Sequence, residues 1–154
     1  MAIHRINPEQ QPDWPKDHVR RYLATDGAEG YWADFTAVGG PEKAPNLILT
    51  VTGRRSGRSR SLGLIYGEMD GLYVIIGSKG GAPQHPAWYL DLVANPAVQV
   101  QIKERKFHAN ARVASGEERA VLWNMMVELY GGYADVQHNT EREFPVVVLE
   151  PIEG

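Results

Sequence analysis

An arginine-rich turn contains the residues whose types and spacing could do the most specific chemistry. Residues 52–60 read TGRRSGRSR, in which two serines and two glycines separate or flank Arg54, Arg55, Arg58 and Arg60. An arginine fork binds two oxygens of a phosphate or carboxylate at once, and glycine lets backbone N–H groups approach the same anion. The turn is neither a Walker loop nor a dinucleotide fingerprint. It therefore predicts an anion site of another kind, unless it is simply a solvated hairpin turn.

A second candidate lies in residues 77–89, GSKGGAPQHPAWY, which follow one expected strand and lead into a helix. Ser78 and Lys79 supply a hydroxyl and a cation, and the helix that begins after Pro86 offers backbone N–H groups to an anion. Trp88 and Tyr89 could flank a planar ring, although two core aromatics would give the same pattern. Two basic loops after neighbouring strands favour a binding site.

The third candidate is YGGYADVQ, residues 130–137, expected to be a glycine-rich loop beyond a helix. The hydroxyls of Tyr130 and Tyr133 could orient or protonate a substrate, and their rings could form a pocket wall. Tyrosines in such places are more often edges of the core.

No further group of residues predicts catalysis. The five histidines have no i, i+4 pair, no serine lies in a GxSxG motif, and the chain contains no cysteine. A metal site, a serine nucleophile and thiolate chemistry are therefore not expected. The absence of an evident catalytic group favours either binding alone or a cofactor that carries the chemistry.

The charge of the chain is unevenly distributed. The net charge is -3, yet residues 51–110 carry eight Lys and Arg against four Asp and Glu, and the flanking segments are acidic. Local positive charge in an acidic protein favours a small anionic ligand over a long nucleic acid. The absence of cysteine, of a signal-peptide core and of any apolar stretch near ~20 residues predicts a cytoplasmic protein without a transmembrane segment, for which peripheral membrane contact stays possible.

The elements that must position these residues follow from the hydrophobic pattern. Helices are expected over 15–25, 87–95 and 115–130, the last with a Ser115–Glu118 capping box. Strands are expected over 46–52, 61–68, 72–78, 98–102, 106–113 and 144–150. Short connections favour antiparallel pairing and a barrel without exposed edges. The sequence therefore predicts one α+β domain over residues 1–154, a split antiparallel β-barrel of about six strands with three flanking helices, in which residues 1–40 form the N-terminal helix and a covering loop.

The three candidate stretches together resemble a known family. The run from Asn46 to Val100, the loop Tyr130–Gln137 and the terminal PVVVLEP are similar to the deazaflavin (F420)-dependent nitroreductases, in the F420-dependent branch of the split β-barrel flavin-binding fold. The resemblance covers roughly residues 46–151, and the motifs TTGRxSGxxR, SKGGAPxHPxWYxNLxANP and YxxYAxYQ occur in the same order. It implies that coenzyme F420 is the cofactor.

The resemblance also implies which residues hold that cofactor. Arg54, Arg55, Ser56 and Arg60 would grip its phosphate and acidic glutamyl tail, and Ser61, Leu62, Gly63, Leu64 and Ile65 would lie along the ring through backbone contacts. Ile76, Gly77, Ser78 and Lys79 would contact the ring and ribityl chain, and Ala87, Trp88, Tyr89, Leu90 and Asp91 would close the phosphate end. Tyr133 would cover the ring on the substrate side, where Tyr130 and Ser78 line the pocket.

Two residues depart from the family pattern. Asp91 stands where Asn or His is common, which puts an acid near an anionic tail. Val136 replaces an expected third pocket tyrosine, so substrate choice should differ from that of nitroaromatic reductases.

We therefore expect hydride transfer from reduced F420 to a quinone, enone or nitro-type acceptor, with Tyr133, Tyr130 or Ser78 orienting the acceptor or helping proton delivery. An FMN-dependent oxidoreductase of the same barrel fold is the alternative, since one phosphate would also suit the arginines. A non-catalytic barrel that binds nucleic acid or a cofactor is a more distant one, disfavoured by the acidity of the chain and the lack of aromatics in the turn.

Overall fold

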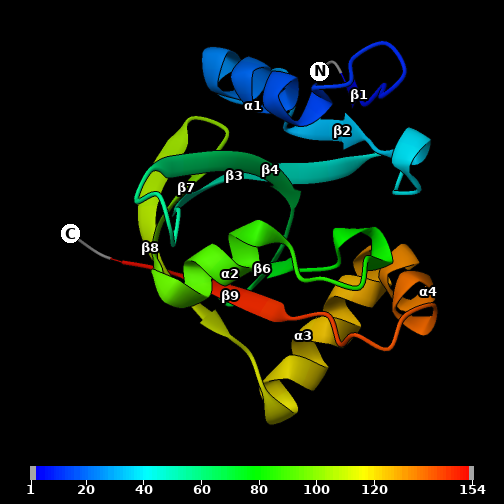
Figure 1. Cartoon of the computed structure of the whole chain (residues 1–154), viewed down its shortest axis with the longest axis vertical. Helices are drawn as coiled ribbons and strands as arrows, with labels where there is room; N and C mark the ends of the chain where they lie inside the picture. The colour runs from blue at the N-terminus through cyan, green and yellow to red at the C-terminus, as the bar shows by residue number, and fades with distance from the viewer. Residues whose placement is uncertain (1–2, 153–154) are drawn as a thin grey trace.

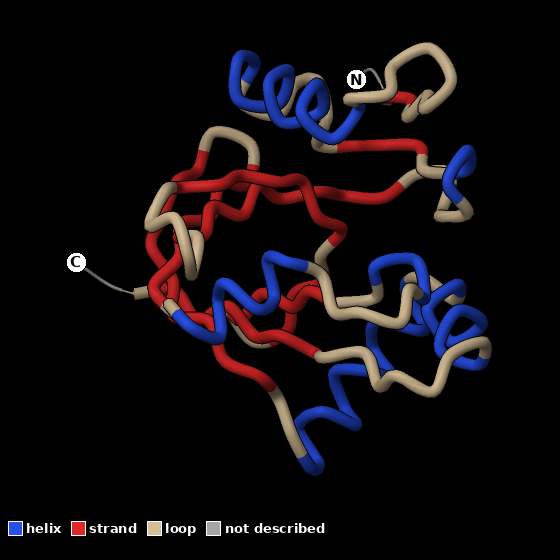
Figure 2. The backbone as a smooth tube through the Cα atoms, viewed as in Figure 1, coloured by secondary structure: helices blue, strands red, loops and turns tan. Residues whose placement is uncertain are grey.

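The structure is a computed structural model that describes residues 3–152, and it shows a curled, mainly antiparallel sheet with helices on its outside (Figure 1, Figure 2). The strands of this part of the chain are β1 (His4–Arg5), β2 (Trp32–Asp34), β3 (Ala44–Thr52), β4 (Ser59–Ile65), β5 (Gly67–Met69), β6 (Leu72–Ile76), β7 (Ala97–Ile102), β8 (Arg105–Val113) and β9 (Val146–Pro151). The α-helices are α1 (Trp14–Thr25), α2 (Ala87–Ala94), α3 (Gly116–Leu129) and α4 (Gly132–His138), and two short 3₁₀ turns are η1 (Thr36–Val38) and η2 (Lys79–Gly81).

The sheet runs in the order β1-β2-β3-β7-β8-β9-β6-β5, and β4 pairs with β3 alone. All pairs are antiparallel except β1 with β2. The predicted hairpins β5–β6 and β7–β8 are confirmed, because tight turns with left-handed Asp70, Gly71 and Lys103 reverse the chain between them. Figure 1 shows α1 over the layer that contains β3 and β4, and α3 and α4 beside the layer that contains β6 and β9.

Two apolar clusters hold this arrangement together. The larger one lies within the curl of the sheet, where Leu47, Leu49 and Val147 have no exposed surface. The second lies between the sheet and α3, where Met126 and Phe144 are also fully buried. Burial of each such side chain stabilises the fold by about 1.5–3 kcal/mol. The two clusters therefore stabilise the layer that contains β3 and β4 and the layer that contains β6 and β9. The residues of the predicted site belong to these two layers and to the loops and helices beside them.

The predicted strand 61–68 divides into two strands at Tyr66. β4 pairs with β3, whereas β5 pairs with β6, so the chain changes partners at this residue. The Tyr66 side chain is buried, and its hydroxyl lies 2.9 Å from the Tyr31 hydroxyl. A hydrophobic pattern cannot register such a change of partner, because it reports which residues are buried and not which strand they pair with.

The counts of about six strands and three helices are wrong, since the described residues contain nine strands and four α-helices. Residues 27–45 are not only a loop, because β2 and η1 lie there, and β1 precedes α1. These strands have two or three residues, too few for a periodic pattern. The helix α4 was missed because it is short and begins among glycines.

The Ser115–Glu118 capping box is also wrong. Ser115 precedes α3 but makes no side-chain cap hydrogen bond, and the Glu118 carboxylate instead pairs with Arg112 of β8. Within residues 3–152, no helix has the length and apolar character needed to cross a membrane.

Candidate functional site

The arginine-rich turn joins β3 to β4 and is tightly folded. The Gly53 N–H donates to the Arg58 carbonyl at 2.8 Å, and the Gly57 N–H donates to the Gly53 carbonyl at 2.9 Å. The Ser56 hydroxyl accepts from the Arg58 N–H at 3.1 Å, and Gly57 has φ +69°, a conformation that glycine adopts without strain. The turn therefore closes on itself, and its arginines are exposed to solvent.

Asp91 of α2 lies beneath these arginines. Its Oδ1 accepts from the Arg54 N–H at 3.1 Å and from Arg54 Nη1 at 2.8 Å, while Oδ2 is 3.9 Å from Arg60 Nη1. Asp91 is 2% exposed. Burial alone would raise the pKa of Asp91, but the hydrogen bonds from Arg54 and the charges of Arg54 and Arg60 hold this pKa below its ordinary value. The acid that departs from the family pattern thus holds Arg54 and faces Arg60.

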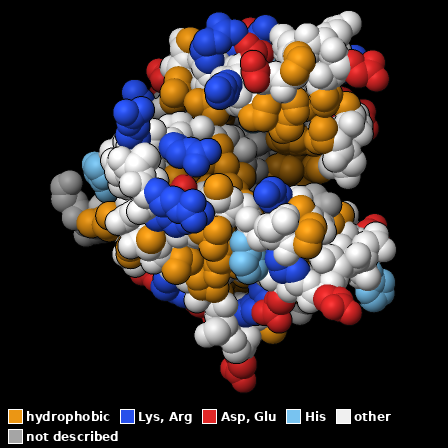
Figure 3. Space-filling model, viewed as in Figure 1, with side chains coloured by type: hydrophobic (Ala, Val, Ile, Leu, Met, Phe, Trp, Pro, Cys, Tyr) orange, Lys and Arg blue, Asp and Glu red, His pale blue; other side chains and the backbone are white. Residues whose placement is uncertain are grey.

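We call Arg54, Arg55, Ser56, Arg58, Arg60 and Asp91 the arginine clamp. Figure 3 shows Lys and Arg side chains gathered over the β3–β4 turn and α2, and beside them a hollow with an apolar floor. The hollow lies between the layer with β4 and the layer with α4 (Figure 1, Figure 3). A polyanionic tail could be held at the clamp while an apolar ring enters the hollow.

β4 leads from the clamp along this hollow with one free edge. Within residues 3–152 it pairs with β3 only, so the backbone N–H and C=O groups of its other edge have no strand partner. The Ser61 hydroxyl bonds Thr50 at 2.7 Å, and Leu62 and Leu64 pack on the core. A Cβ on Gly63 would come within 2.7 Å of the His18 ring of α1. The side chains of Ser61, Leu62 and Leu64 thus already contact other parts of the protein. The backbone N–H and C=O groups of the free edge are therefore the groups of β4 that could bind a ligand.

The loop after β6 carries Ser78 and Lys79. Ile76 and Gly77 are buried, Ser78 is half-buried, and Lys79 is exposed with φ 46°. The guanidinium of Arg142 donates to the carbonyls of Gly77 at 2.9 Å, Ser78 at 2.6 Å and Ala82 at 2.9 Å. The sequence did not identify Arg142, because a single arginine among glutamates resembles ordinary surface charge.

The two candidate tyrosines lie where α3 gives way to α4, with Tyr130 at the C-terminal cap of α3 and Tyr133 in the first turn of α4. The Tyr130 hydroxyl donates to the Tyr66 carbonyl at 3.0 Å, and the Tyr130 and Tyr133 rings meet edge to face at 6.2 Å. Burial, helped by the neighbouring Tyr31, raises the pKa of Tyr130 to about 12, and burial also raises the pKa of Tyr133. Both phenols are therefore neutral hydrogen-bond donors at physiological pH.

α4 also closes on the loop that follows β6. Val136 occupies the space beside Gly81, where an added Cβ would lie 2.8 Å from the Val136 side chain. Gly81 has φ +83° as well, so glycine is required there on two counts. The contact brings the Tyr133 helix and the Ser78 loop to one end of the molecule (Figure 1).

Of the predicted α2 residues, only Asp91 reaches the clamp arginines through a hydrogen bond. Trp88 is 8% exposed and belongs to the core cluster, which agrees with the alternative of a core aromatic. Tyr89 packs its ring against His85 at 4.8 Å, whereas Ala87 and Leu90 are exposed.

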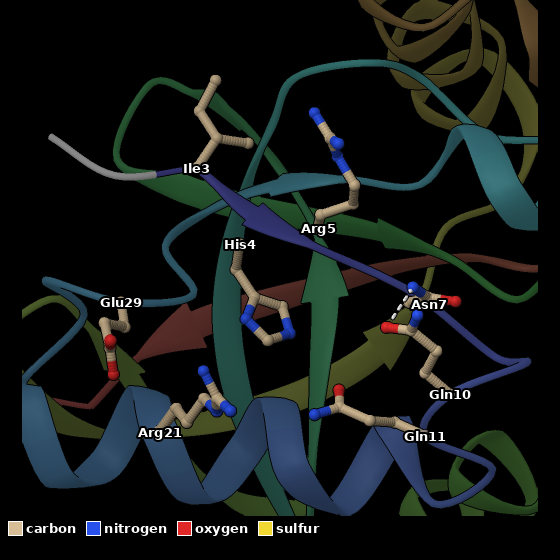
Figure 4. Close-up of a pocket in the computed structure, with 8 residues that line it drawn as sticks. All are labelled: Ile3, His4, Arg5, Asn7, Gln10, Gln11, Arg21 and Glu29. Atoms are coloured by element: carbon tan, nitrogen blue, oxygen red, sulfur yellow. Dashed lines mark hydrogen bonds between the residues drawn. The ribbon is translucent and has the colours of Figure 1, made fainter.

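Two open surface pockets lie elsewhere. One, of about 260 Å³, lies between β1 and α1 and is lined by polar side chains that include His4, Arg21 and Glu29 (Figure 4). The other, of about 240 Å³, lies between β6 and the start of α3. Neither contains a predicted site residue. The arginine clamp stays the candidate site, because four arginines lie in one turn and two of them, Arg54 and Arg60, face the buried Asp91.

Comparison with known proteins shows the family of the chain. The sequence profile of the F420H(2)-dependent quinone reductase family matches residues 14–151. An F420H(2)-dependent quinone reductase of Mycobacterium tuberculosis (strain ATCC 25618 / H37Rv) is 35% identical over 135 residues, 86% of each chain. A solved F420-H2 dependent reductase (FDR-A) has 41% identity and a TM-score of 0.65, covering 69% of this chain and 94% of its own.

A second solved structure, described as a domain-swapped dimer, is 36% identical with a TM-score of 0.68 and covers 90% of this chain and 98% of its own. The match to the family profile extends over α1, the clamp, the Ser78 loop and α4, because its matched residues run from Trp14 to Pro151. The chain therefore belongs to the F420H(2)-dependent quinone reductase family.

Proposed function

We propose that this chain catalyses hydride transfer from reduced F420 to a quinone. The observation that carries the proposal is the arginine clamp, a set of exposed arginines at the start of a strand with a free edge, in which the buried Asp91 holds Arg54. Four arginines exceed what a single phosphate requires, and they suit a ligand that carries a phosphate and several carboxylates. This favours F420 over FMN.

The residues present fit that cofactor. In the proposal, Arg54, Arg55, Ser56 and Arg60 hold its anionic end, and the backbone edge of residues 61–65 lies along its ring. Residues 76–79 contact the ring and ribityl chain, and Ala87–Asp91 support the anionic end, with Asp91 acting through Arg54. Bound in its reduced form, F420 supplies the hydride.

On the acceptor side, the protein needs to position a carbonyl and exclude water. Tyr133 packs against Tyr130 and Trp123, and no hydrogen-bond partner of its hydroxyl lies among the described residues, so it is free to donate to an acceptor oxygen. Tyr130 already donates to the Tyr66 carbonyl and supports Tyr133. Ser78 would supply a second donor from the facing loop.

We also propose the finer features that the resemblance implies. The curled sheet would be a split β-barrel, and the chain would form one cofactor-binding unit over residues 1–154. A small-molecule acceptor and a cytoplasmic location belong to the same proposal. Quinone reduction comes before enone and nitroaromatic reduction in this proposal, because the family to which the chain belongs is that of the F420H(2)-dependent quinone reductases.

The test is turnover of reduced F420 by the purified protein with a menadione-type quinone, followed by the return of oxidised F420 absorbance. We expect quinone-dependent oxidation, and tighter binding of F420 than of FMN in parallel fluorescence titrations. A protein that binds FMN more tightly, or that binds F420 without quinone-dependent oxidation, contradicts the proposal.

A further inference from the structure

Arg142 lies between α4 and β9 and joins both walls of the proposed acceptor pocket. Its guanidinium donates to three carbonyls of the 77–82 loop, and Nη1 also lies 3.0 Å from His85 Nδ1. These contacts cross at least 57 residues of sequence, so nothing local imposes them. The planar fork of arginine spreads its donors over all four acceptors, which the single ammonium of lysine cannot do.

The other end of the same residue is fixed to α4. Gln137 donates to the Arg142 carbonyl at 2.8 Å, and its Oε1 accepts from the Phe144 N–H at 2.9 Å. The Arg142 guanidinium stacks 4.9 Å from the Phe144 ring, which is fully buried. The backbone of the Arg142 segment is thus anchored to α4, which carries Tyr133, and the guanidinium of Arg142 contacts the loop that carries Ser78.

The geometry points to Arg142 as a positioning residue that sets the separation of Ser78 and Tyr133 and so controls acceptor turnover. This inference rests on the proposed function. Arg142 does not touch the arginine clamp in any described contact, and its effect should therefore fall on the acceptor and spare the binding of F420.

Arg119 provides a matched control. It is a partly buried arginine whose Nη1 donates at 2.9 Å to the Phe144 carbonyl, and it pairs with Glu143 and stacks 5.6 Å from the Trp123 ring. It therefore holds the same 142–144 segment but makes no described contact with the 77–82 loop. If the segment needed a cation only for its structure, substitution of either arginine would lower kcat/KM to the same extent.

The experiment compares Arg142→Gln, Arg142→Lys and Arg142→Ala with the same changes at Arg119. For the Arg142 variants we expect kcat/KM for menadione to fall roughly 10- to 100-fold, while the Kd for F420 stays within about threefold. Lysine should not rescue, and guanidinium ions in the buffer should partly restore Arg142→Ala but not Arg119→Ala. Equal losses of kcat/KM at Arg142 and Arg119 would overturn the inference. An Arg142→Lys variant with the kcat/KM of the wild-type protein would also overturn it.

A second readout does not depend on activity. Lys79 is exposed in the loop that Arg142 holds, so trypsin cleavage after Lys79, followed by mass spectrometry on the cofactor-free protein, measures how often the loop opens. We expect cleavage at least about tenfold faster in Arg142→Gln than in Arg119→Gln, a change that corresponds to weaker closure of the loop. If cleavage after Lys79 is unchanged in Arg142→Gln, the proposed role of Arg142 is wrong, whether or not the protein reduces quinones. If the protein does not reduce quinones, only the proposed function is contradicted.

Discussion

At the scale of single residues, Asp91 has the largest influence on the arginine clamp. Its carboxylate is buried and bonds both the N–H and the guanidinium of Arg54. A carboxylate whose pKa is lowered by such partners stabilises the folded state above its unfolded pKa of about 4, and this contribution disappears as the pH falls through the folded value. The clamp is therefore fully formed at neutral pH.

Asp91→Ala should weaken F420 binding about tenfold, because Arg54 loses the partner that orients its fork. Asp91→Asn keeps an oxygen acceptor for the Arg54 N–H and should have a smaller effect. Fluorescence titration of F420 at low and high salt measures both variants. Tighter binding by Asp91→Ala would mean that repulsion of the anionic tail by Asp91 outweighs the ordering of Arg54.

We expect the hydroxyl of Tyr130 to be structural and that of Tyr133 to be functional. Tyr130→Phe removes a hydrogen bond to the Tyr66 carbonyl and should lower the free energy of unfolding by about 1 kcal/mol. Tyr133→Phe should change stability by less than about 0.5 kcal/mol yet reduce quinone turnover at least about 10-fold. Urea unfolding and steady-state kinetics check the pair, and equal turnover in Tyr133→Phe and wild type would exclude its hydroxyl from the reaction.

At the scale of elements, α1 is fitted closely to the strand proposed to hold the ring. His18 is 1% exposed, its Nε2 lies 2.8 Å from the Gly30 carbonyl, and its ring fills the space beside Gly63 of β4. Any side chain at Gly63 must displace either the helix or the strand. The N-terminal segment therefore constrains the free edge of β4 without containing a clamp residue.

Gly63→Ala should lower the free energy of unfolding by about 1–3 kcal/mol, since the added methyl overlaps a packed ring. The loss should shrink in a His18→Ala background, where the ring is absent, so a double-mutant cycle by urea unfolding measures the contact. Gly132→Ala is the matched control, because nothing lies within 4 Å of the added methyl there. Identical losses in both backgrounds would show that α1 is not the cause.

At the scale of the whole molecule, a histidine pair helps attach the N-terminal segment to the sheet. The rings of His4 on β1 and His18 on α1 stack at 5.1 Å with an interplanar angle of 7°. Burial, and next the charge of Arg21, lowers the pKa of His4 against the opposing effect of Asp17 and Glu29. Burial also lowers the pKa of His18, although its hydrogen bond with the Gly30 carbonyl acts in the opposite direction.

Acidification should therefore loosen this attachment. A histidine with a lowered folded pKa binds protons more readily in the unfolded chain, so the free energy of unfolding should decrease as the pH falls below about 6.5. Urea unfolding at pH 7.5 and 5.5 measures the decrease, which should be smaller in His4→Gln. An unchanged pH dependence in that variant would assign the effect to other groups.

The sequence by itself determined the local elements. The bounds of α1 and α2 and the hairpins β5–β6 and β7–β8 follow from spacing, turn residues and residue type, which act over a few residues of chain. Anion binding by TGRRSGRSR stays a prediction. The family resemblance in these motifs agreed with the comparisons in its F420 dependence, whereas the family that the comparisons show is that of the F420H(2)-dependent quinone reductases, not the nitroreductases. Short-range physics is sufficient for features of this kind.

Only the tertiary structure decided how those motifs are supported. Asp91 meets Arg54 across 37 residues, and Arg142 meets Ser78 across 64, so neither contact has a periodic or local signature. The free edge of β4 depends on which strands pair elsewhere, and the short β1 and β2 pair with each other and, through β2, with β3. Partners of charged side chains and of strand edges are chosen by packing of distant segments, which no single stretch of sequence encodes.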